Sequence, residues 1–84
     1  MSKEKFIDNV NFGVKRNKNY MVVKIKSSSD FDYKLVIVQK HDIIHTMKKY
    51  ISSTDEDMTF KDSGDQIIDV LMTSNLNDLF WFVY

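Results

Sequence analysis

The feature that most constrains the fold is a pair of strand-like segments separated by a short polar loop. In residues 19–26, Met21, Val23 and Ile25 recur at every second position, a period typical of a strand with one buried face. Residues 33–40 form a second segment, rich in β-branched side chains. The stretch SSSDFD between them consists mainly of turn-forming residues, so we expect an antiparallel hairpin.

The alternation also predicts the two faces of this hairpin. We expect Leu35 and Ile37 to share the buried face with the apolar residues of the first strand. The opposite, outer face would then carry an aromatic residue among lysines. Its expected members are Tyr20, Lys24, Lys26, Lys34 and Lys40.

Three further segments have helical patterns. Residues 42–52 place Ile43 and Met47 on one face, with Asp42 as the expected N-cap. Ser63 and Gln66 have the spacing of a capping box, which predicts a helix over 64–74. A shorter helix is expected over 3–11, and a short strand over 58–60.

The segment 79–84 is an uninterrupted apolar run that contains four of the eleven aromatic residues. We interpret it as a strand that is apolar on both faces, which suits a covered sheet or an edge that joins another chain. On that interpretation Leu79, Trp81 and Val83 pack on one side. Phe80, Phe82 and Tyr84 lie on the other, partly open side.

These elements predict a single α+β domain over residues 1–84. Its small antiparallel sheet would combine the hairpin 19–26/33–40 with strand 79–84 and the short strand, packed by helices 42–52 and 64–74 and by the N-terminal helix. The chain has no cysteine, so neither disulfides nor thiolate ligands support the fold. The first residues lack the apolar stretch of a signal peptide, and the longest apolar run is too short to cross a bilayer. A cytoplasmic location without membrane contact is therefore expected.

The zero net charge conceals an asymmetry between the two parts of the chain. Residues 1–50 contain eleven Lys or Arg and five Asp or Glu residues, a net charge of +6, whereas residues 51–84 contain one and seven, a net charge of −6. The two parts either neutralise each other in the fold or present a basic and an acidic surface to partners. Alanine and proline are absent and arginine occurs once, which suggests AT-rich codons and a phage, another AT-rich virus or a low-GC bacterium as the source.

Patterns for catalysis, cofactors and metals are weak. His41 and His45 have a spacing that can chelate zinc, but two ligands do not make a site. Asp55, Asp57 and Thr59 match the first ligands of a calcium loop, yet Phe60 occupies the position that requires glycine. No nucleophile signature or glycine-rich phosphate loop is present. We therefore expect no enzyme, no cofactor and no metal site.

The composition instead favours a small binding module. The preferred hypothesis is a phage- or virus-type accessory protein that inhibits or modulates a host or defence protein by stoichiometric occlusion. The alternatives are RNA or DNA binding by the lysine and tyrosine face of the hairpin, and a homodimer. The candidate partner-binding residues are Tyr20, Lys24, Lys26, His45, Lys48, Lys49, Asp55, Glu56, Asp57, Phe80, Phe82 and Tyr84.

Overall fold

The computed structural model describes residues 1–83 and shows a small α+β fold. Its three strands form one antiparallel sheet in the order β2-β1-β3. Short 3-10 turns, η1 (Lys40–Asp42) and η2 (Leu76–Asp78), precede the second and third helices. The principal elements are α1 (Lys3–Lys15), β1 (Tyr20–Lys26), β2 (Tyr33–Gln39), α2 (Ile43–Ser53), β3 (Gln66–Thr73) and α3 (Leu79–Phe82).

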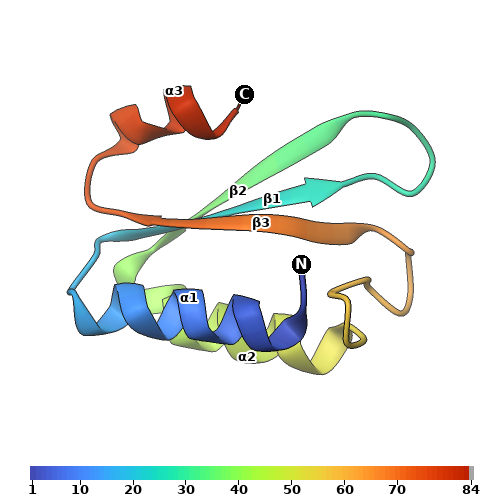
Figure 1. Cartoon of the computed structure of the whole chain (residues 1–84), viewed down its shortest axis with the longest axis horizontal. Coiled ribbons are helices and arrows are strands. Elements are labelled where there is room, and N and C mark those ends of the chain that lie inside the picture. The colour runs from blue at the N-terminus through green and yellow to red at the C-terminus, as the bar shows by residue number, and fades with distance from the viewer. Residues whose placement is uncertain (84) are drawn as a thin grey trace.

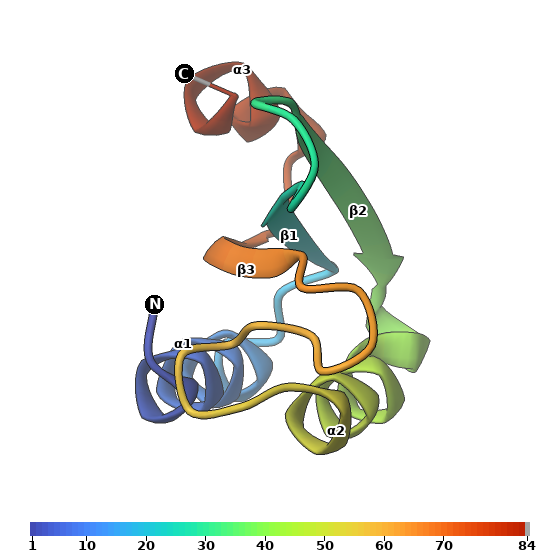
Figure 2. The same cartoon turned by 90° about the vertical axis from the view of Figure 1, so that its right-hand side faces the viewer.

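The helices lie on both sides of the sheet. α1 and α2 lie side by side against one face, which we call the inner face, and α3 lies on the other, the outer face (Figures 1 and 2). The main core is formed between the inner face and the two long helices. No helix within residues 1–83 is long and apolar enough to cross a membrane.

The N-terminal helix confirms the prediction and extends beyond it. The Ser2 hydroxyl accepts a hydrogen bond from the Lys5 N–H at 3.1 Å, which satisfies one of the free amides at the start of α1. Phe6 and Val10, one turn apart, are fully buried against the sheet. Gly13 does not end the helix, which continues to Lys15. It lies inside the last turn because the helix passes close to β3 there.

The hairpin is confirmed, but the expected faces of its second strand are wrong. Val38 pairs with Met21 and Val36 with Val23, so these two valines share the inner face. Leu35 and Ile37 lie on the outer face. The reason is the register. In an unbroken apolar run, alternation cannot decide which set faces inward, and a shift of one residue exchanges the faces.

The predicted helix over 64–74 is wrong, because these residues form strand β3. β3 pairs with β1 and forms the border of the sheet opposite β2, and a bulge at Lys24 and Ile25 breaks its alternation. Ser63 and Gln66 therefore do not form a capping box. The Ser63 hydroxyl accepts from the Asp65 N–H, and the Gln66 amide donates to the Asp57 carbonyl.

Helix α2 confirms the prediction over 42–52, and Ile43 and Met47 are buried in the core. Asp42 makes no side-chain capping bond. At the other end, the Lys3 ammonium donates to the carbonyls of Ile51 and Thr54 at 2.9 and 2.8 Å. The helix C-terminus is thus capped by a cation from α1, where positive charge is favourable.

The expected strand over 58–60 is reduced to isolated bridges. Thr54 pairs with Phe60 and Thr59 with Gln66, and no longer ladder forms. Met58, directly before Thr59, has a positive φ of 65° and a fully buried side chain.

The predicted C-terminal strand is also wrong, because residues 79–82 form the short helix α3. Both edges of β1 are occupied by β2 and β3, so the segment has no place in the centre of the sheet. Instead it lies over the outer face, where Val22 is fully buried although it points away from the main core. Tyr84 lies outside the described residues.

Candidate interaction surface

A network of short hydrogen bonds holds the turn that leads from β3 to α3. The Thr73 hydroxyl donates to the Asp78 carboxylate at 2.6 Å and accepts from the Asn75 N–H at 3.0 Å. The Asn75 side chain in turn accepts from the Asn77 N–H at 3.0 Å, which caps the η2 turn. Because Thr73 is buried at the end of β3, this network fixes the direction in which the chain leaves the sheet.

Lys24 connects the outer face to α3. Its ammonium nitrogen donates to the Phe82 carbonyl at 3.3 Å and lies 5.8 Å from the centre of the Phe82 ring. It also lies 5.0 Å from the centre of the Tyr33 ring. A cation at the C-terminus of a helix and above aromatic rings is favourable on both counts. Lys24 and Phe82 are both half-buried as a result.

The outward side of α3 carries large apolar side chains in contact with solvent. Phe80 is 69% exposed, Trp81 80% and Val83 52%, and we call these three residues the C-terminal patch. The rings of Phe80 and Trp81 meet edge to face, with centroids 6.3 Å apart. Leu79 and Phe82 are the less exposed residues of the segment.

A shallow hollow lies beside the C-terminal patch. It is lined by Leu71, Asp78, Trp81 and Phe82, has a volume of about 310 Å³ and is mainly apolar. An apolar hollow next to exposed aromatic rings can receive a side chain from another molecule.

The basic candidates on α2 lie on a different side of the molecule. His45, Lys48 and Lys49 are exposed on α2, beneath the inner face, whereas α3 lies above the outer face (Figure 1). The His41 imidazole lies 3.3 Å from the Asp42 carboxylate, and both side chains are exposed. Within residues 1–83, no group of three or more histidine or acidic residues is arranged to hold a metal ion.

The acidic candidates form a tight loop after α2. Asp55 accepts hydrogen bonds from the N–H groups of Asp57 and Thr59, each at 3.1 Å, and Asp57 accepts from Thr59 at 3.2 Å. The side-chain hydrogen bond with Asp55, followed by that with Thr59, lowers the pKa of Asp57. Glu56 is exposed, and its carbonyl accepts from the Lys3 N–H at 2.9 Å. The acidic side chains of this loop therefore order its backbone.

The lysine face is smaller than expected. Tyr20, Lys24 and Lys26 lie on the outer face of β1, as predicted. Lys34 lies on the inner face opposite Ile25, and Lys40 belongs to the η1 turn beyond the strand. α3 also covers part of the face and contacts Lys24 through Phe82.

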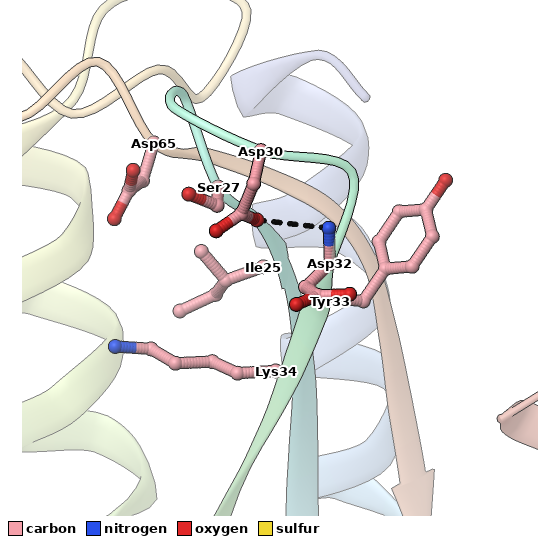
Figure 3. A pocket seen from close by; sticks show the side chains of 7 residues that line it. All are labelled: Ile25, Ser27, Asp30, Asp32, Tyr33, Lys34 and Asp65. Atoms are coloured by element: carbon pink, nitrogen blue, oxygen red, sulfur yellow. Dashed lines mark hydrogen bonds between the residues drawn. The ribbon is translucent and has the colours of Figure 1, made fainter.

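A second hollow lies where the hairpin loop joins the start of β2. Its volume is about 210 Å³, and Figure 3 shows the seven side chains that line it. Asp30 accepts from the Asp32 N–H, and Asp65 accepts from the Ser28 N–H, each at 2.9 Å. Lys34 extends along one side. Two of these carboxylates thus bind backbone amides and order the loops.

Sequence reasoning missed Trp81 and Phe31 as surface residues. Trp81 is expected inside when the segment is taken as a strand, but the helical turn leaves it exposed while Phe82 faces Lys24. Phe31, 91% exposed in the hairpin loop, carries no pattern that could have identified it. The signal that could have indicated a helix is the spacing of Leu79 and Phe82, because apolar residues three positions apart lie on the same helical face.

Comparison with known proteins adds no functional assignment. The chain matches no protein-family model, and neither curated proteins nor solved structures include a significant match. Functional conclusions therefore depend on the residues and their geometry.

Proposed function

We propose that this chain is a small non-enzymatic binding module that attaches to another protein through the C-terminal patch. The observation that carries the proposal is the exposure of Phe80 and Trp81 on the four-residue helix α3 and of Val83 directly after it. Burial of one such side chain is worth roughly 1.5–3 kcal/mol, so a cluster left in water favours association. Aromatic anchors beside a hollow are typical of the centre of protein interfaces.

The mechanism would be stoichiometric occlusion. The patch contacts an apolar site on the partner, and Lys26, exposed on the same face, supplies a positive charge that steers the approach. The codon bias inferred from the composition supports a phage- or virus-type accessory protein. A host or defence protein is the corresponding class of partner.

The single tryptophan provides a direct assay. Trp81 is the only tryptophan of the chain and is largely exposed, so its fluorescence should be that of an indole in water. A partner captured by affinity purification from the natural host would then be titrated into the pure protein. We expect a blue shift of the emission that saturates at a fixed stoichiometry. An unchanged emission in a complex that forms by another assay would contradict the use of this patch.

Alanine variants separate the patch from the rest of the surface. Phe80→Ala should weaken binding by about 2 kcal/mol, roughly 30-fold in Kd, because it removes an anchor. Phe12→Ala is the matched control, since Phe12 is 59% exposed on α1 at the opposite side of the sheet. Equal losses in the two variants would refute the assignment.

The RNA or DNA alternative has less support. It requires a continuous lysine face, but Lys34 lies on the inner face and Lys24 contacts α3. A nucleic-acid affinity that falls steeply with salt and is lost on charge reversal at Lys26 would favour this alternative.

A further inference from the structure

Strand β2 forms one border of the sheet, and no described strand pairs with its outer edge. In Figure 2 the strand lies at the side of the molecule remote from α1 and β3. Edge strands of natural proteins are usually protected by charge, by proline or by an irregular backbone. β2 has one charged residue, Lys34, contains no proline and pairs with β1 along its whole length without a bulge.

The hydrogen-bonding pattern identifies the free amide groups. The Ser27 N–H donates to the Asp32 carbonyl at 3.2 Å, so residues 27 and 32 form a hydrogen-bonded pair at the start of the hairpin. Because such pairs alternate in an antiparallel ladder, residues 34, 36 and 38 direct their backbone groups toward β1. The free edge therefore presents the N–H and C=O groups of Tyr33, Leu35, Ile37 and Gln39.

The side chains along this edge are mostly apolar and partly open to water. Tyr33 is 54% exposed and Ile37 47%, while Leu35 and Val36 are half-buried. An open row of backbone groups flanked by apolar side chains is a template for the addition of another strand.

The strand is self-complementary in one antiparallel register. If β2 pairs with a second copy about Val36, every residue of Tyr33–Gln39 finds a partner, and Leu35 of one copy lies opposite Ile37 of the other. The four outward-facing residues then form hydrogen-bonded pairs, about eight bonds in all. Just beyond each end of the strand, Asp32 of one copy lies opposite Lys40 of the other. Opposite charges at such positions are favourable.

Neighbouring registers are less favourable. A shift that centres the pairing on Ile37 places Lys34 opposite Lys40 of the second copy, where like charges repel. A shift that centres it on Leu35 places the Asp32 carboxylate opposite Val38 and leaves Gln39 beyond the strand. Only the register about Val36 combines full length, apolar pairs and opposite charges.

We infer that this protein forms a symmetric homodimer in which β2 pairs with β2 of a second copy and the two sheets become continuous. A two-fold axis perpendicular to the sheet keeps both outer faces on the same side. The dimer therefore presents two C-terminal patches in one direction, which would increase the avidity for a partner with repeated sites. The inference is independent of the proposed function, because none of its contacts uses α3.

The test combines measurement of the mass in solution with charge-reversal variants of the proposed contact. Sedimentation equilibrium of the wild-type chain should give twice the 10.0 kDa monomer mass. Asp32→Lys and Lys40→Asp should each raise the dimer dissociation constant about tenfold, because both symmetric pairs become like-charged. A mixture of the two variants should recover the wild-type affinity as a heterodimer, since both of its pairs are again opposite in sign. Both side chains are exposed and make no hydrogen bond within the described residues, so folding should be preserved.

Two controls separate this contact from other routes of association. Asp8→Lys makes the same charge change on the exposed side of α1, away from β2, and should leave the dimer intact. Trp81→Ala should also leave it intact, and Trp81 emission should not vary with protein concentration. Association that is lost in Trp81→Ala but kept in Asp32→Lys would instead assign self-association to the C-terminal patch and overturn the inference.

Amide exchange measured by NMR gives a residue-level readout. In the dimer, the N–H groups of Leu35 and Ile37 should be protected from exchange to a similar degree as the N–H group of Val36. When dilution dissociates the dimer, Leu35 and Ile37 should lose this protection, whereas Val36 should keep it through its bonds to β1. A monomeric wild-type protein at millimolar concentration, or failure of the mixed variants to associate, would overturn the inference.

Discussion

Substitution of Gly13 by alanine tests how closely α1 packs on β3. An added methyl group would lie within 3 Å of the Cβ of Met72, and 2.5 and 2.7 Å from its Cγ and Cε atoms. The Cβ atom is attached to the backbone of β3, so no change of side-chain rotamer can move it away. The helix or the strand must shift instead.

Two opposing effects determine the sign. In an open helix, Gly→Ala stabilises by roughly 0.5–1 kcal/mol, because alanine loses less backbone entropy on folding. Overpacking of a closely packed interface costs about 1–3 kcal/mol. The clash exceeds the helical gain, and we expect Gly13→Ala to reduce the free energy of unfolding by about 1 kcal/mol.

The assay is thermal unfolding followed by circular dichroism. In a domain of this size, a change of 1 kcal/mol shifts Tm by about 4–8 °C, so Tm should fall by approximately that amount. Asn11→Ala on the exposed side of the same helix is the control, and it should raise Tm slightly through helix propensity. If Gly13→Ala raises Tm as Asn11→Ala does, the close approach of α1 to β3 is wrong.

Two further predictions concern the docking of α3 and the effect of pH. Lys24→Met removes the ammonium group that donates to the Phe82 carbonyl, so we expect faster amide exchange in α3 and a lower fluorescence anisotropy of Trp81. The change in Tm should be at most a few degrees. Unchanged amide exchange would show that Lys24 does not hold α3. Because the pKa of Asp57 is lowered in the folded state, its contribution to stability is complete above the ordinary aspartate pKa of about 4 and is lost as the pH falls through the lower folded value. Tm measured from pH 7 to pH 2.5 should therefore fall less steeply in Asp57→Asn than in the wild type, and parallel curves would contradict this.

The candidate site was partly predictable. The apolar composition of residues 79–84 identified their aromatic side chains as candidates for a contact surface, and the structure places Phe80 at the surface as expected. Trp81 and Phe82 exchanged their expected roles, because a helical turn distributes side chains differently from a strand. The exposed charges of α2 and of the Asp55–Asp57 loop were identified, but only the fold shows that they lie away from α3.

Local patterns determined the elements whose signals are independent of distant contacts. Ser2 with Phe6 and Val10 specified α1, alternation and a polar loop specified the hairpin, and the spacing of Ile43 and Met47 specified α2. In each case, neighbours in the sequence supply the capping, the turn or the apolar face, so the sequence alone was sufficient.

Tertiary structure decided the remaining elements. Ile67, Ile68 and Leu71 have a spacing that fits a helix, but the open edge of β1 required a partner, and a bulge accommodated the residues as strand β3. With both edges of β1 occupied, Leu79–Phe82 had no central position left in the sheet and coiled over the outer face. The register of β2 was likewise set by tertiary packing, with Val38 buried in the core and α2 against the strand. Backbone pairing and burial are properties of the assembled sheet, and in these segments they outweigh local preference.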